Sequence, residues 1–177
     1  GSYAQDPMTH FGKLMRLTED GTAAPDNPFV GESDYLPEIY SMGHRNQLGL
    51  AWHPETGDLW ATENGPQGGD EANIIRSGAN YGWPLASYSR EYSGVRVSDT
   101  PWRPEFEDAE VLWWPSIGPS GLTFYDGTHF PQWQGNLKVG SMMEGRMPRT
   151  ASTSALAADL KGGTRNTVFC LDTNPVH

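Results

Sequence analysis

The stretch GHRNQLGLAWHPETGDLWATENGPQGGDE, residues 43–71, determines how the rest of this chain is interpreted. Apolar and small residues recur in two short segments, Leu48 to Trp52 and Asp58 to Thr62. Between them lies Pro54-Glu55-Thr56-Gly57, whose proline and glycine are typical of a tight turn. The stretch therefore predicts a β-hairpin with a four-residue loop.

The segment before this hairpin offers hydrogen-bond donors that suit an anion. Arg45 and Asn46 follow Gly43 on a predicted turn. A guanidinium group can bind a carboxylate through two parallel hydrogen bonds, and an amide adds a further donor. The same arginine could instead pair with a local acid such as Glu38 or Asp70.

The segment after the hairpin has the chemistry of a calcium loop. Residues 65–71, Gly-Pro-Gln-Gly-Gly-Asp-Glu, combine glycines that let carbonyl groups turn inward with the adjacent carboxylates of Asp70 and Glu71. Calcium takes about six to eight oxygen ligands from carboxylates, carbonyls and water. The acidic series of an EF-hand does not occur in this stretch. A solvent-exposed acidic turn is the alternative interpretation.

Other strand and turn patterns predict an all-β chain. Lys13 to Leu17 alternates in polarity and leads to Asp20-Gly21, a dipeptide typical of hairpins. A second predicted hairpin, Gly121–Phe124 with Gly135–Lys138, repeats the pattern of the first after 72 to 78 residues. A propeller blade takes roughly 40–50 residues, so this interval fits one blade enlarged by an insert within residues 83–114. An ordinary antiparallel sandwich would also contain two such hairpins.

The charge and hydropathy of the chain limit its partners. It has 12 Lys+Arg against 22 Asp+Glu, a formal net charge of −10. Nucleic acids and anionic membrane surfaces are therefore not expected partners, because both need a basic face. Cations and neutral solutes such as sugars suit this balance better. No apolar run approaches the ~18 residues of a membrane-spanning helix, so no membrane insertion is expected.

The last 34 residues differ from the preceding part of the chain. Of the 20 aromatic residues, 19 lie in positions 1–143. The formal charge changes from −11 in that part (8 basic, 19 acidic) to +1 in residues 144–177 (4 basic, 3 acidic). We therefore expect the β-structure in residues 1–143 and interpret residues 144–177 as an atypical tail, in which Ala151 to Lys161 could form a short helix.

A series of short motifs occurs in a fixed order over about residues 4–143. They are Gly12–Leu17, Asp26–Phe29, Gly43–Asn46, Gly49–Ala51, Glu63–Pro66, Gly69–Glu71, Asn80–Pro84, Tyr92–Gly94, Pro119–Leu122, Phe130–Trp133 and Gly140–Ser141. No single motif is decisive, but the ordered set closely resembles the soluble sugar dehydrogenases that depend on pyrroloquinoline quinone (PQQ), the glucose/sorbosone dehydrogenase family.

The resemblance implies a partial six-bladed β-propeller, with about three blades in this chain. It implies a periplasmic or secreted enzyme that oxidises an aldose sugar at C1 to a lactone and passes electrons to an external acceptor. The implied cofactors are PQQ, a small tricarboxylate, and a calcium ion on which it lies. One ligand of this kind would explain why an anion-binding turn and a cation-binding loop flank the same hairpin.

The resemblance also assigns individual site residues. Nine of them would contact or line the quinone: Arg45, Asn46, Asn64, Asp70, Ser87, Tyr88, Tyr92, Ser141 and Met142. The carbonyl groups of Gly65 and Pro66 would hold the calcium beneath it. Glu71 and the region of Tyr81 match a second, structural calcium site.

The sequence departs from the family at three places. Asn46-Gln47-Leu48-Gly49 stands where the family usually has Asn-Pro-Gln-Gly, and Met143 stands where a lysine is usual. The general base of the family lies before the first residue of this chain, so no catalytic residue is assigned here. His44 and His53 are interpreted as structural. The chain alone is expected to be inactive.

Two other functions are consistent with the sequence. The first is a non-catalytic extracellular propeller that binds calcium and a protein or carbohydrate partner, like the domain of hedgehog-interacting protein that resembles this family. The second is a lectin blade that stacks sugars on Trp113 and Trp114. We interpret these two tryptophans as core residues, because tryptophan is usually well buried.

Overall fold

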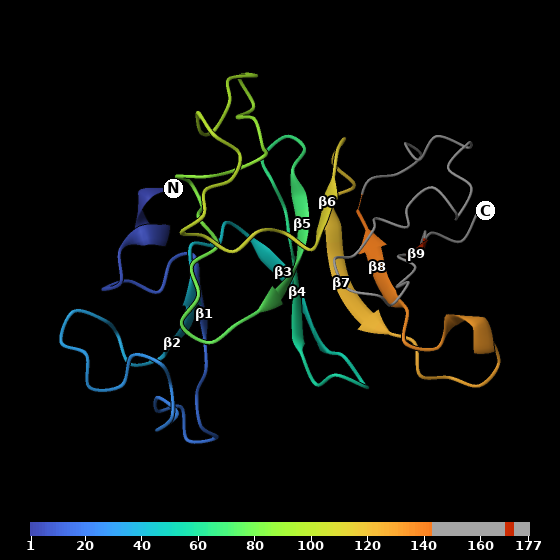
Figure 1. The fold of residues 1–177 in the computed structure, drawn as a ribbon, viewed down its shortest axis with the longest axis horizontal. Coiled ribbons are helices and arrows are strands. Elements are labelled where there is room, and N and C mark those ends of the chain that lie inside the picture. The colour runs from blue at the N-terminus through green and yellow to red at the C-terminus, as the bar shows by residue number, and fades with distance from the viewer. Residues whose placement is uncertain (143–168, 172–177) are drawn as a thin grey trace. The chain divides into compact units, whose positions relative to one another are not determined.

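The computed structural model describes residues 1–142 and 169–171 of the chain (Figure 1). The elements in order are η1 (Ser2–Gln5), β1 (Lys13–Met15), β2 (Ile39–Met42), β3 (Gln47–Trp52), β4 (Leu59–Glu63), β5 (Asp70–Ile75), β6 (Val111–Trp113), β7 (Pro119–Phe124), η2 (Pro131–Trp133), β8 (Leu137–Ser141) and β9 (Phe169–Leu171). η1 and η2 are short 3₁₀ helices, and the described residues contain no α-helix. In the same residues no helix is long and apolar enough to cross a membrane.

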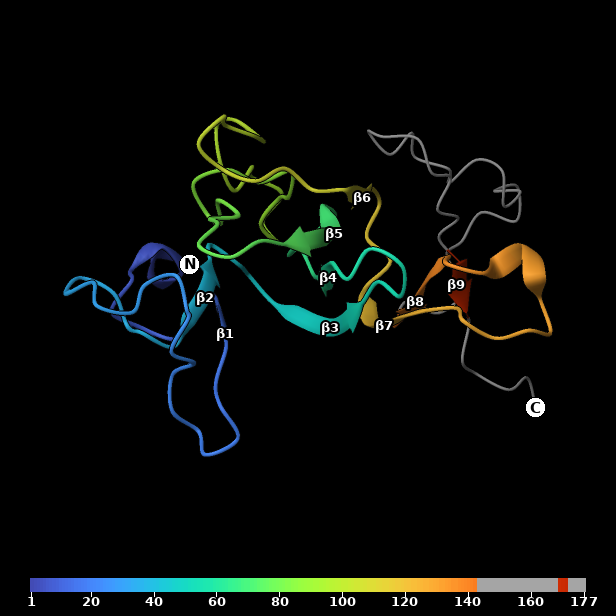
Figure 2. The same ribbon diagram turned by 60° about the horizontal axis from the view of Figure 1, so that its bottom comes forward.

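The strands form three sheets, which Figure 2 shows from a second direction. β1 and β2 form an antiparallel pair, and β3, β4, β5 and β6 form a four-stranded sheet in chain order. β7 and β8 form an antiparallel hairpin, with β9 parallel to β8. A four-stranded sheet in chain order is the repeating unit of a propeller, and the all-β, propeller-type prediction is confirmed. The helix predicted within residues 151–161 lies outside the described residues.

The chain divides into two compact units. The first unit comprises Gly1–Asn46, Gly65–Gly69 and Ile75–Asp108. The second comprises Gln47–Asn64, Asp70–Ile74 and the described residues from Ala109 onward. The first therefore contains the β1–β2 sheet, and the second contains most of the four-stranded sheet together with β7, β8 and β9.

A buried lysine organises the start of the first unit. Lys13 on β1 is only 9% exposed, and its Nζ donates hydrogen bonds of 2.9 Å to the carbonyl oxygens of Tyr3, Ala4 and Phe11. Burial lowers the pKa of this ammonium group, and the charge of Asp6 opposes that shift. The three hydrogen bonds satisfy the buried ammonium and tie η1 to β1.

The hairpin predicted from residues 43–71 is present as β3 and β4. The strands pair antiparallel, with Leu50 opposite Ala61. In the loop between them, Nδ1 of His53 accepts hydrogen bonds of 3.2 Å from the backbone N–H groups of Glu55 and Thr56. His53 therefore shapes the turn, which confirms its structural interpretation.

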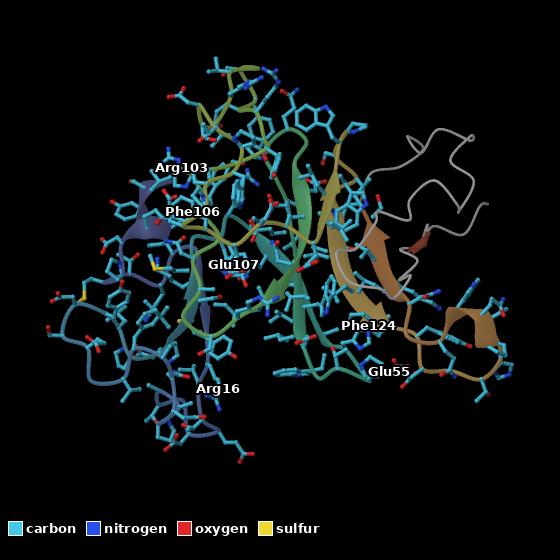
Figure 3. The ribbon with its side chains drawn as sticks, in the orientation of Figure 1. Arg16, Glu55, Arg103, Phe106, Glu107 and Phe124 are labelled. Carbon is cyan, nitrogen blue, oxygen red and sulfur yellow. The ribbon has the colours of Figure 1, made fainter. Side chains whose placement is uncertain are left out.

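The core of the second unit lies between the β3–β4 hairpin and the second predicted hairpin, β7–β8. It consists of Trp60, Ala72, Val111, Trp113, Phe124, Leu137 and Val139. Trp60 meets Phe124 (labelled in Figure 3) edge-on, with ring centroids 5.9 Å apart, a favoured geometry for aromatic pairs. A Cβ at Gly49 on β3 would lie 2.8 Å from the backbone of Ser120 and Leu122, so only glycine allows β7 this close.

The predicted insert is confirmed, and the two adjacent tryptophans have different environments. β5 ends at Ile75 and β6 begins at Val111, and the described residues between them form no strand. Trp113, at the end of β6, is 3% exposed, as predicted. Trp114 is 55% exposed, so its prediction as a core residue is wrong. Successive side chains of an extended chain point to opposite faces, and only one of the two can face the core.

Candidate functional site

In the first unit, two segments far apart in the sequence are joined by their backbones. Met42 N–H donates to Ala79 O (3.0 Å), Tyr81 N–H to Met42 O (2.9 Å), and Trp83 N–H to Gly43 O (2.9 Å). Gly43 has a φ of +74°, and a Cβ there would lie 2.0 Å from Asn80 Oδ1. Glycine is therefore required for this approach. The turn that carries Arg45 is fixed against residues 79–83.

Arg45 lies on this fixed turn and contacts an aromatic ring. Its Cζ is 5.5 Å from the centroid of the Trp83 ring, within the range of a cation–π contact. Arg45 is half-buried and the adjacent Asn46 is exposed. The turn thus carries a half-buried guanidinium and an exposed amide, and its role as an anion-binding segment stays a prediction.

The loop Gly65–Gly69 belongs to the same compact unit as Arg45. Gly68 and Gly69 have φ values of +69° and +68°, and a Cβ at Gly65 would lie 2.1 Å from Gly68 O. The hydroxyl of the buried Ser89 donates to Gly68 O at 2.9 Å. The backbone of the loop therefore folds back on itself in a way that only glycine permits. That Arg45 and this loop bind the same ligand stays a prediction.

Tyr81 is buried beside His44 in the first unit. The two rings stack with centroids 4.5 Å apart, and His44 Nε2 lies 2.8 Å from Ser41 Oγ. The hydroxyl of Tyr81 accepts a hydrogen bond of 2.9 Å from the backbone N–H of Arg76. His44 is 1% exposed, and these contacts agree with its interpretation as a structural residue. Its ring packs on Tyr81, a residue that the resemblance assigns to the second calcium site.

Ser87, Tyr88 and Tyr92, three of the nine residues predicted to contact or line the quinone, differ in exposure and contacts. The Ser87 N–H donates to Ser98 Oγ (2.9 Å), and the Tyr88 hydroxyl donates to Asp108 Oδ1 (3.0 Å). Tyr92 is 77% exposed. Ser87 and Tyr88 thus have fixed positions within the insert, whereas the Tyr92 ring is free of protein cover over most of its surface.

Asp70, in the second unit, anchors a loop. Its Oδ2 accepts hydrogen bonds from the Ser116 hydroxyl (2.6 Å) and from the backbone N–H groups of Ile117 (2.8 Å) and Gly118 (2.9 Å). Its side chain is fully buried. Three donors on one oxygen compensate for burying this carboxylate, so Asp70 has a clear structural role.

Ser141 and Met142 lie on the other side of this loop in the second unit. The Ser141 hydroxyl donates to Ile117 O, and the Met142 N–H donates to Gly118 O at 2.8 Å. Met142 is 59% exposed. Asp70, Ser141 and Met142 are therefore joined through one loop, because all three make hydrogen bonds with Ile117 or Gly118. The structure thus brings together three of the residues predicted to line the quinone.

Glu71 and Asn73 form an oxygen-rich pair on β5 of the second unit. Asn73 Nδ2 donates to Glu71 Oε2 at 3.2 Å, and alternate residues of a strand lie on one face. Asn73 is 1% exposed, and its Oδ1 has no hydrogen-bond partner in the part of the chain that the structure describes. Asn64, also predicted as a site residue, is half-buried just after β4.

The donors present suit a hard cation. The described residues contain no group of three or more His, Cys, Asp or Glu side chains that could hold a metal. A transition-metal site built from imidazole or thiolate ligands is thus not present in these residues. Calcium instead accepts backbone carbonyls, amide oxygens and single carboxylates. The glycine loop and the Glu71–Asn73 pair supply these types of ligand.

Residues 1–161 match the family model for glucose/sorbosone dehydrogenase. The chain belongs to the glucose/sorbosone dehydrogenase family. It is 43% identical over 143 residues to the aldose sugar dehydrogenase YliI of Escherichia coli, covering 80% of this chain and 38% of that protein. The family predicted from the ordered motifs is thereby confirmed.

Solved structures of the glucose/sorbosone dehydrogenase type match as well. A glucose dehydrogenase crystal structure is 46% identical with a TM-score of 0.76, covering 78% of this chain and 41% of that one. The PQQ-bound form of an aldose sugar dehydrogenase from Streptomyces coelicolor is 37% identical with a TM-score of 0.52, covering 67% of this chain and 31% of that one. This chain spans about two fifths or less of the length of these relatives.

The residues of this glucose/sorbosone dehydrogenase chain fit the groups that its family implies. Arg45 and Asn46 carry donors of the type that the carboxylates of PQQ would need, and Gly65 and Pro66 belong to a loop whose backbone conformation depends on glycine. The sequence assigned no individual role to Trp83 or Ser116, and it included Ser89 only within the segment 87–92 that the resemblance places along the cofactor pocket. Trp83 lies in a quoted motif and Ser89 in the predicted pocket segment, but only coordinates identify the partners of these side chains.

Proposed function

We propose that this chain is the cofactor-binding part of a PQQ- and calcium-dependent aldose dehydrogenase. The substrate is an aldose sugar oxidised at C1 to a lactone, with an external electron acceptor, in the periplasm or outside the cell. One structural observation carries the proposal. A single compact unit contains both the accessible Arg45–Asn46 turn and the glycine-dependent loop Gly65–Gly69, the donors for an anion and the carbonyls for a cation.

In this proposal the residues of the chain bind and orient the cofactors. Arg45 and Asn46 donate hydrogen bonds to the carboxylate edge of PQQ, and the Gly65 and Pro66 carbonyls hold calcium. Glu71 and Tyr81 are the residues proposed to bind a second, structural calcium. The remaining contacts to the quinone come from Asn64, Asp70, Ser87, Tyr88, Tyr92, Ser141 and Met142.

The chemistry of the reaction belongs to the cofactor. When bound, PQQ on its calcium ion supplies the two-electron oxidant for the sugar. The chain's own residues exclude water and fix the orientation of the quinone. His44 takes no proton in this scheme, because it is buried between Ser41 and Tyr81.

Titration of the chain with PQQ tests the proposal. We expect saturable absorbance changes in the presence of calcium that disappear when calcium is chelated. Arg45→Ala should weaken binding roughly 10- to 100-fold, because a hydrogen bond to a charged group contributes about 1.5–3 kcal/mol. Arg103→Ala is a matched control, since Arg103 lies in the same unit and makes exposed contacts with Thr100 (3.3 Å) and Glu105 (4.0 Å).

The same titration separates the proposal from its alternative. Binding of calcium without any binding of PQQ would contradict a dehydrogenase and support a non-catalytic calcium-binding module. Equal losses of PQQ affinity in Arg45→Ala and Arg103→Ala would contradict the specific role of Arg45, because a general charge effect would then explain the binding.

A further inference from the structure

The contact between Arg45 and Trp83 indicates that Trp83 influences ligand binding through the side chain of Arg45. The Arg45 guanidinium carbon lies 5.5 Å from the centroid of the indole ring. We infer that Trp83 is a positioning residue, whose ring holds the Arg45 guanidinium in the orientation that binds a carboxylate of the quinone. This inference rests on the proposed function of Arg45.

The backbone of Trp83 is held at both of its polar groups. Its N–H donates to Gly43 O at 2.9 Å, and its carbonyl accepts from Gln5 Nε2 at 2.8 Å. Gln5 in turn exchanges hydrogen bonds with the Asn80 side chain, at 2.8 and 3.1 Å. The indole therefore stands on a part of the first unit that is fixed to the same turn as Arg45.

The geometry of a guanidinium explains why a ring suits this task. The five N–H donors of arginine lie in the plane of the group, whereas an aromatic ring attracts the face of the cation. A face-on contact with the ring does not itself use the in-plane N–H groups that bind a carboxylate. A free arginine side chain loses rotamer entropy when it is fixed, and a ring that restricts it beforehand reduces this cost on binding.

A spectroscopic measurement tests the contact without any ligand. In the full 177-residue chain, the Nε–H proton resonance of Arg45 should be displaced upfield by the ring current of Trp83. Trp83→Leu should remove the displacement, and Trp83→Tyr should retain most of it. An Arg45 resonance at its ordinary position in the wild-type chain would overturn the inference, whether or not PQQ binds.

Titration with PQQ and calcium tests the consequence for binding. Trp83→Leu should weaken PQQ binding roughly 3- to 30-fold, the range of a cation–π contact, and Trp83→Tyr should recover most of the affinity. In an Arg45→Leu background, Trp83→Leu should cause no further loss, because its effect acts through the guanidinium. The same loss in both backgrounds would overturn the inference in favour of simple packing.

Controls separate this inference from folding and from the proposed function. Trp102→Leu removes another tryptophan of the first unit, 45% exposed, and should leave PQQ affinity unchanged. Circular dichroism of each variant reports whether it folds. If Trp83→Leu does not fold, the PQQ affinity of Trp83→Tyr and the Arg45 resonance of the wild type test the positioning role of Trp83. A displaced resonance without PQQ binding to the wild type would refute the proposed function, and the positioning contact would stand.

Discussion

Arg16 and Asp26 form a two-pronged ion pair on the surface of the first unit. Nη1 and Nη2 of Arg16 (labelled in Figure 3) donate to the two carboxylate oxygens of Asp26 at 2.9 and 3.1 Å. These hydrogen bonds lower the pKa of Asp26 from 3.8 and raise that of Arg16. A lowered aspartate pKa stabilises the folded state above the unfolded pKa, and this contribution is lost as the pH falls.

Asp26→Asn should therefore lower the urea midpoint of unfolding at pH 7, and the difference from wild type should shrink as the pH falls below 3.8. The effect should be small, because exposed ion pairs contribute little. Asp34→Asn is the control, an exposed aspartate of the same unit whose carboxylate accepts a hydrogen bond from the neighbouring Ser33 hydroxyl and makes no ion pair within the described residues. A difference that is constant from pH 7 to pH 3 would contradict the ion-pair explanation.

The roles of some single residues could be predicted from the sequence, and those of others could not. His44 and His53 were correctly interpreted as structural, since a histidine at a strand end usually satisfies local backbone or side-chain groups. The role of Lys13 was not predicted. Its position in an alternating strand suggests a solvent-facing residue, but the carbonyls that accept from it come from a turn of η1 and the residues around it. No local pattern encodes that convergence.

At the scale of elements, turn residues identified the hairpins because glycine and proline act locally. Both predicted hairpins are present, and the insert after β5 is where the motif spacing placed it. The junction of residues 42–43 with residues 79–83 could not be predicted, because it needs a parallel bridge between Met42 and Asn80. That junction fixes Arg45 against Trp83. The sequence therefore identified Arg45 as a candidate residue, but it could not predict the contacts that hold this residue in place.

The glycine loop allows a sharp test at this scale. Gly65→Ala should weaken calcium binding at least about 10-fold and destabilise the fold by about 1–3 kcal/mol, because the new methyl group would lie 2.1 Å from Gly68 O and force the loop to move. Calorimetric titration with calcium and urea unfolding measure the two effects. Gly121→Ala is the control, since a Cβ there meets nothing within 4 Å.

A calcium affinity of Gly65→Ala equal to that of Gly121→Ala would contradict the role of this loop in holding the ion. Loss of stability without loss of calcium affinity would lead to the same conclusion, because it would separate the conformation of the loop from metal binding. The comparison depends on both variants being titrated under conditions in which they are fully folded, which the unfolding curves establish.

At the scale of the whole molecule, the described strands leave an apolar face uncovered. Leu48, Leu50 and Trp52 lie on one face of β3, at an end of the four-stranded sheet, and are 45%, 54% and 64% exposed. A propeller closes into a ring because isolated sheets expose such faces and their edges. The sequence predicted a partial propeller because the motifs accounted for about three of six blades.

The positions of the histidines in this chain bear on whether it can oxidise a sugar. Its two buried histidines, His44 beside Tyr81 and His53 in the β3–β4 loop, are engaged in structural contacts. A general base must reach the proton that it removes, and neither side chain has that access. We therefore expect the chain to bind PQQ and calcium but to give no catalytic dye reduction with an aldose. The assay is run beside the Escherichia coli aldose sugar dehydrogenase YliI, the relative that is 43% identical, as a positive control. Dye reduction by this chain at roughly 1–1000 turnovers per second, the range of ordinary enzymes, would show that it contains a base that we have not identified.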